Sequence, residues 1–63
     1  MAGLIDFNGS YEIRINDRIS IYRRPNGRTD QIILDGMVVA LCPSLESAYT
    51  VARALKLYTL EDN

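Results

Sequence analysis

Four short stretches in the first part of the chain have the hydrophobic pattern of β-strands. Ser10–Ile15 and Ile19–Arg23 alternate between apolar and polar side chains, as half-buried strands do. Gln31–Leu34 and Met37–Leu41 are apolar runs that are too short and too β-branched for helices. They flank Asp35-Gly36, which indicates a two-residue hairpin because both positions of such a turn need a positive φ.

The turns between these strands predict one consistent register. A three-residue loop at Asn16–Arg18 keeps apolar residues opposite apolar residues, whereas a two-residue loop would scramble the faces. Type I′ turns are predicted at Asn26-Gly27 and at Asp35-Gly36. The three choices agree on one sheet, which favours the fold beyond each local signal. The predicted pairs are Ile15–Ile19, Ile13–Ile21, Arg24–Thr29, Arg23–Asp30, Ile21–Ile32, Ile19–Leu34, Leu34–Met37, Ile32–Val39 and Asp30–Leu41.

A helix is predicted to follow the last strand, from Leu45 to about Tyr58. Ser44 is a favourable N-cap, and Glu46 in the first turn suits the positive end of the helix dipole. The residues from Leu60 onward are predicted to fray. The apolar stripe of this helix comprises Leu45, Ala48, Tyr49, Val51, Ala52, Leu55 and Tyr58.

These elements predict a single small α+β domain over residues 1–63. Its fold would be a four-stranded antiparallel β-meander, in the order 1-2-3-4, with one C-terminal helix packed on one face. The face under the helix would carry Tyr11, Ile13, Ile15, Ile19, Ile21, Ile32, Leu34, Met37, Val39 and Leu41. The other face would carry Glu12, Arg14, Ser20, Tyr22, Arg24, Thr29, Gln31, Ile33, Val38, Ala40 and Cys42.

This second face is less polar than a solvated sheet face normally is. Its centre would be an apolar patch of Tyr22, Ile33, Val38 and Ala40, and such patches with polar rims mark interaction surfaces. The alternative is that the N-terminal residues Leu4, Ile5 and Phe7 cover it. We predict that the partner-binding residues are Arg14, Tyr22, Arg24, Ile33 and Val38.

Length and composition narrow the functional classes. At 63 residues the domain is marginally stable unless a disulfide, a metal or oligomerisation helps it. Cys42 is the only cysteine and there is no histidine, so we expect no internal disulfide, no metal and no cofactor. A small chain without disulfides suggests a reducing, cytoplasmic setting, and we expect no membrane span and no signal peptide.

The same composition argues against catalysis. The common general base is missing, and the serines have no visible base partner. We interpret Cys42 as a small apolar residue at a strand end, and Gly27 and Gly36 as turn glycines. We therefore expect no catalytic residues and no enzyme.

Residues 1–9, Met-Ala-Gly-Leu-Ile-Asp-Phe-Asn-Gly, resemble the signature motif of the LAGLIDADG-type homing endonucleases. In that family the motif forms a helix at a subunit interface. Its penultimate acidic residue binds the metal that DNA cleavage needs, and a following sheet lies on the DNA. Here Asn8 stands at the acidic position, and Asp35-Gly36 joins two strands where the family has a helix. We interpret the match as coincidental or as a non-catalytic remnant.

A non-catalytic protein–protein interaction module is the function we expect. Small chains of this kind include phage or mobile-element inhibitors of host machinery, such as anti-CRISPR proteins. A homodimer through the outer sheet face is a second use of the same patch. The alternative is a nucleic-acid-binding domain, with Tyr22 available for stacking. The net charge of −1 disfavours it, although five arginines share one window: Arg14, Arg18, Arg23, Arg24 and Arg28.

Overall fold

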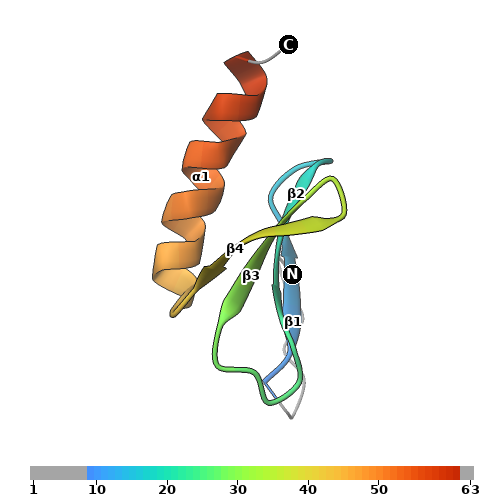
Figure 1. Cartoon of the computed structure of the whole chain (residues 1–63), viewed down its shortest axis with the longest axis vertical. Helices are drawn as coiled ribbons and strands as arrows, with labels where there is room; N and C mark the ends of the chain where they lie inside the picture. Colours follow the sequence, from blue (N-terminus) through green and yellow to red (C-terminus); the bar gives the residue numbers. More distant parts are fainter. Residues whose placement is uncertain (1–8, 62–63) are drawn as a thin grey trace.

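A computed structural model describes residues 9–61 of the chain (Figure 1). Its elements are β1 (Tyr11–Arg14), β2 (Ile19–Arg23), β3 (Asp30–Leu34), β4 (Met37–Cys42) and α1 (Leu45–Glu61). The strands form one antiparallel sheet in the order β1-β2-β3-β4, and α1 packs against β2, β3 and β4. The predicted four-stranded meander with one C-terminal helix is confirmed.

Two of the predicted turns are confirmed, and an ion pair links them. In the loop after β1, the Asn16 side-chain oxygen accepts hydrogen bonds from the backbone N–H of Arg18 and of Ile19, both at 2.8 Å. Asp35 and Gly36 have φ values of 52° and 85°, as a type I′ turn requires. The Arg18 guanidinium donates to the Asp35 carboxylate through Nε at 3.0 Å and Nη2 at 2.8 Å. This pair holds one end of the meander together.

The loop between β2 and β3 contains a different turn from the predicted one. The Gly27 N–H donates to the Arg24 carbonyl at 2.8 Å, so Pro25 and Asn26 are the two central residues. Asn26 has a φ of 58°, and a proline followed by a positive φ is typical of a type II turn. The prediction of a type I′ turn at Asn26-Gly27 was therefore wrong. Pro25 takes the first central position of the observed turn, because its fixed φ suits that position. The pairing of Arg24 with Thr29 is also absent from the observed register.

A β-bulge in β4 reverses the faces of its last three residues. Val39 is the extra residue, and one extra residue moves every later side chain to the opposite face. Ala40 and Cys42, which were predicted on the outer face, therefore face α1, whereas Leu41 moves outward. The predicted pairs Ile32–Val39 and Asp30–Leu41 are wrong, and the observed pairs are Ile33–Val38, Ile32–Ala40, Gln31–Leu41 and Asp30–Cys42.

The core lies between α1 and the inner face of the sheet. Its enclosed apolar residues are Ile19, Ile21, Ile32, Cys42, Ala48 and Ala52. The small side chains of Ala48 and Ala52 let the helix backbone approach the strands closely. Ser44 is the N-cap as predicted: its Oγ accepts the Ser47 N–H at 3.2 Å, and the Ser47 Oγ accepts the Ser44 N–H at 3.3 Å.

The helix is longer than predicted and buries a narrower stripe. It continues to Glu61 instead of fraying from Leu60. Thr59, which the predicted stripe missed, is buried, and its hydroxyl donates to the Lys56 carbonyl at 3.0 Å. Residues predicted to be covered but found exposed are Met37, Val39, Leu41, Tyr49, Val51 and Tyr58. Within residues 9–61, the structure contains no helix that is long and apolar enough to cross a membrane.

Candidate functional site

The sheet face opposite α1 is made of two rows of paired residues. Cross-strand partners lie side by side, so each row forms a continuous strip of side chains. The first row is Arg14, Ser20, Ile33 and Val38, and the second is Glu12, Tyr22, Gln31 and Leu41. Arg24 follows directly after β2, two residues beyond Tyr22 along the chain, and lies outside the two rows on the same face. We call these nine residues the outer face.

All five predicted site residues lie on the outer face. Arg14, Ile33 and Val38 share the first row, whereas Tyr22 belongs to the second and Arg24 lies two residues beyond Tyr22 along the chain. Ala40, which was predicted to belong to the apolar patch, faces α1 instead. Leu41 takes its place on the outer face and is 63% exposed. Sequence reasoning missed Leu41 because no local signal marks the bulge.

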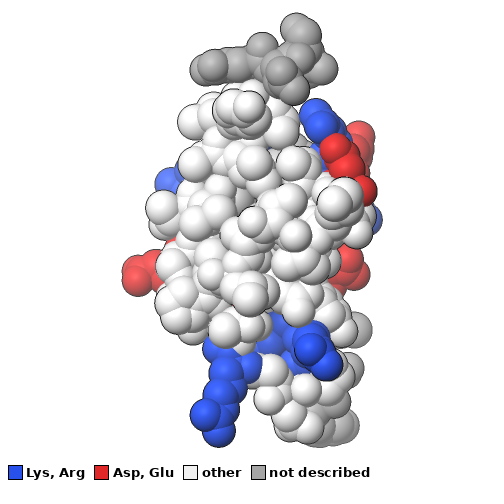
Figure 2. Space-filling model, in the orientation of Figure 1, with Lys and Arg blue, Asp and Glu red and all other residues white. Residues whose placement is uncertain are grey.

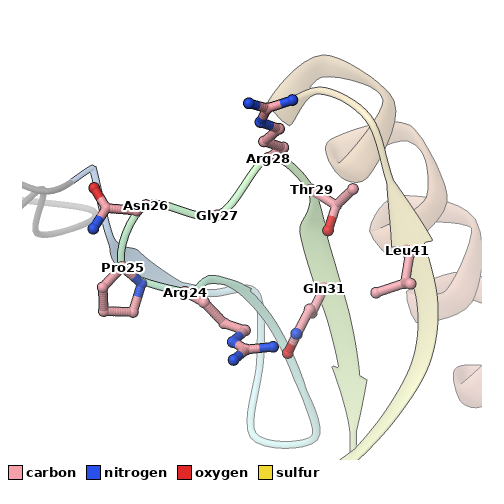
Figure 3. A pocket seen from close by; sticks show the side chains of 8 residues that line it. All are labelled: Arg24, Pro25, Asn26, Gly27, Arg28, Thr29, Gln31 and Leu41. Atoms are coloured by element: carbon pink, nitrogen blue, oxygen red, sulfur yellow. The ribbon is translucent and has the colours of Figure 1, made fainter.

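Two shallow depressions hollow the ends of the outer face. One, of about 390 Å³, lies between the loop after β2 and the side chains of Gln31 and Leu41. Arg24 and Leu41 point into it from opposite sides (Figure 3). The other, of about 450 Å³, is lined at the opposite end by Arg14, Ser20 and Ile33 among others. Each depression therefore combines an arginine with an apolar side chain.

The five arginines do not share one face. Arg18 pairs with Asp35 beside the turns, and Arg23 pairs with Asp30 on the inner face, each at 2.8 Å. The structure shows no ion pair for Arg14, Arg24 or Arg28 within the part of the chain it describes. Two of the five positive charges are thus neutralised, and of the other three only Arg14 and Arg24 belong to the outer face, at its opposite ends.

The most deeply buried polar group is the Asp30 carboxylate, which has no exposed surface. It accepts hydrogen bonds from the Tyr11 hydroxyl and from Arg23, through Nε at 3.2 Å and Nη2 at 2.8 Å. The Arg23 guanidinium also lies 5.6 Å from the centre of the Tyr11 ring. The predicted pair of Arg23 with Asp30 is confirmed. This cluster lies on the inner face, so it stabilises the fold and is separate from the outer face.

The Tyr11 hydroxyl predicts a loss of stability at high pH. Burial, and next the hydrogen bond to Asp30, raise the pKa of Tyr11 from 10.0 to about 12. The folded state thus favours the protonated hydroxyl. The contribution of this hydroxyl to the free energy of unfolding is complete below pH 10 and is lost as the pH rises to about 12. Urea unfolding across this range should show a falling free energy of unfolding, with a shallower fall in Tyr11→Phe. Identical profiles for the two proteins would contradict the assignment.

Comparison with known proteins adds no relative. No family model, curated protein or solved structure matches the chain. The resemblance of residues 1–9 to the LAGLIDADG motif stays a prediction, because residues 1–8 lie outside the described part of the chain. The function is therefore argued from the outer face itself.

Proposed function

We propose that the protein is a non-catalytic protein–protein interaction module that binds its partner through the outer face. One observation carries this proposal: Leu41, an exposed apolar side chain, lines the same depression as Arg24, which has no ion pair in the described part of the chain. Val38 and Leu41 are 52% and 63% exposed, although both are apolar. Tyrosine and arginine are enriched at the energetic centres of protein interfaces, and the outer face offers Tyr22 and Arg24.

The chemistry of the outer face defines the partner surface that would fit it. An apolar patch would cover Ile33, Val38 and Leu41. Carboxylates would accept paired hydrogen bonds from Arg14 and Arg24, because the guanidinium fork matches carboxylate geometry. The two depressions would admit side chains of the partner at the ends of the contact.

Inhibition of host machinery, by a protein of phage or mobile-element origin, is the form of this function that we propose to test first. Such a protein, of which anti-CRISPR proteins are examples, acts by occupying a surface that its target needs. The small size of the chain and its lack of histidine support a role that requires contact instead of chemistry.

The placement of the arginines supports a protein partner over a nucleic acid. Nucleic-acid binders gain affinity by presenting several unneutralised positive charges to phosphates along one surface. Here Arg18 and Arg23 are paired with carboxylates, and Glu12 adds a negative charge to the outer face.

The decisive experiment compares two variants in a binding assay with the partner identified from the source cell. Tyr22→Ala combined with Arg24→Ala should weaken binding at least about 100-fold, since each removes a side chain of the hot-spot type. The matched control is Leu57→Ala, which removes an apolar side chain that is 60% exposed on α1. It should bind normally. Both variants should keep the far-ultraviolet spectrum and melting temperature of the wild type.

Two results would contradict the proposal. The first is full affinity in the combined variant. The second is a wild type that binds nonspecific DNA or RNA with an affinity that falls steeply with salt, together with a flatter salt dependence in Arg14→Ala and Arg24→Ala.

A further inference from the structure

The two edges of the sheet differ in charge. β1 is four residues long and carries Glu12 and Arg14. β4 is six residues long and carries no charged residue, and Met37, Val38, Val39 and Leu41 are all about half exposed or more. Charged residues on an edge strand discourage pairing with another chain, whereas an uncharged apolar edge permits it; the bulge at Val39 confines such pairing to the residues on either side of it. β4 is therefore the edge at which a further strand would add.

One flank of α1 extends this apolar edge. Ser47, Val51, Ala54 and Tyr58 recur at spacings of four, three and four residues, so these four uncharged residues lie on one side of the helix, and the next position in the series is Glu61 at its end. Val51 is 37% exposed and Tyr58 is 67% exposed.

This flank of α1 faces the β4 side of the sheet. The opposite flank of α1 carries Lys56, whereas Figure 2 shows an uncharged surface over α1 and β4 on one side of the molecule. α1 itself packs directly against β4. We call the exposed apolar residues of the two elements the β4–α1 surface: Met37, Val38, Val39, Leu41, Val51 and Tyr58.

The charge pattern of this side of the molecule suits contact with an identical copy. Figure 2 shows a broad centre without charged side chains over β4 and α1, with the acidic and basic groups at its margins. In a two-fold symmetric interface each surface meets itself, so a charge near the axis would face its own copy. An uncharged centre avoids that repulsion.

The exposed apolar area supplies about three quarters of what a standard dimer interface buries on each partner. The six side chains of the β4–α1 surface expose roughly 600 Å², and backbone and neighbouring polar atoms add to this. A standard interface buries about 800 Å² per partner. The chain has six enclosed apolar residues in its core, and association is a usual way for domains of this size to gain stability.

We propose that two copies of the chain associate through the β4–α1 surface around a two-fold axis. The two β4 strands run antiparallel beside each other, and Val51 and Tyr58 of each copy cover the contact on the helix side. The two sheets then form one continuous layer with both outer faces on the same side. This dimer shares Val38 and Leu41 with the outer face but joins the two sheets edge to edge instead of face to face, and it does not depend on the proposed function.

Sedimentation equilibrium over a wide range of protein concentrations tests the dimer. The wild type should show twice the chain mass of 7.1 kDa, with a melting temperature that rises with concentration. Val39→Glu and Tyr58→Glu should each weaken dimerisation at least about 100-fold, because each places like charges across the axis. Leu57→Glu is the matched control on the side of α1 away from the sheet, and it should remain a dimer.

A measurement on the wild type alone guards against variants that fail to fold. Amide hydrogen exchange in β4 should slow as the protein concentration rises, whereas exchange in β1 should not change. A monomeric wild type, β4 exchange that is independent of concentration, or equal dissociation of Leu57→Glu and Tyr58→Glu would each overturn the proposal. So would dissociation of the dimer by Tyr22→Ala with Arg24→Ala, because that pair lies on the outer face.

Discussion

Ile32→Ala should destabilise the protein by about 2–5 kcal/mol, enough to unfold much of it at room temperature. Ile32 has no exposed surface and lies between Ile21 and Ala40 in the row of the sheet that α1 covers. The enclosed core also contains Ala48 and Ala52 of the helix. Few other side chains can move to fill the cavity, so most of the lost contacts are not recovered. Urea unfolding at a fixed protein concentration measures the loss.

Ile33→Ala is the matched control for this prediction. It makes the same change one residue along β3, on the outer face, where the side chain is half-buried. The loss should be less than half of that in Ile32→Ala, because less apolar surface is removed from contact. Equal losses in the two variants would mean that the outer face is as enclosed as the core.

Asp30→Asn should cost about 3–5 kcal/mol, an effect as large as that of Ile32→Ala. The substitution keeps the size of the side chain but removes the negative charge that accepts hydrogen bonds from Tyr11 and from Arg23. The guanidinium of Arg23 would then stay partly buried without its counter-charge. No interaction would compensate for the hydration that it loses on folding. Urea unfolding at neutral pH measures this effect.

Asp35→Asn provides the control because it breaks an ion pair of the same type at the surface. The Arg18–Asp35 pair has the same 2.8 Å separation as the Arg23–Asp30 pair, but its side chains are 43% and 53% exposed. Water screens such a pair, and asparagine accepts the positive φ of position 35 as readily as aspartate. The urea midpoint of Asp35→Asn should stay close to that of the wild type. A similar loss in both variants would show that burial of Asp30 does not strengthen its interactions.

The candidate site could be predicted wherever turns set the register. Arg14 and Tyr22 lie on strands next to the three-residue loop, and Ile33 is positioned by the pairing of β2 with β3. Local turn chemistry therefore placed Arg14 and Tyr22 on the outer face, whereas Ile33 was placed by the two-residue period of β2 and β3, since the turn predicted between them was wrong. Leu41 could not be predicted, because its face depends on the bulge at Val39.

The sequence by itself determined the order of the elements, the antiparallel meander and the start of the helix. These features follow from contacts between residues close in the chain, such as the Asp35-Gly36 turn and the Ser44 cap.

Only the tertiary structure decided which residues of β4 face α1. Without the bulge, Val39 and Leu41 would lie under the helix, whereas with it the smaller Ala40 and Cys42 do. Small side chains there allow the close packing that Ala48 and Ala52 also require. Which residues of β4 face α1 depends on the space between the helix and the sheet, and no local sequence pattern indicates that space. The same arrangement leaves apolar side chains of β4 exposed.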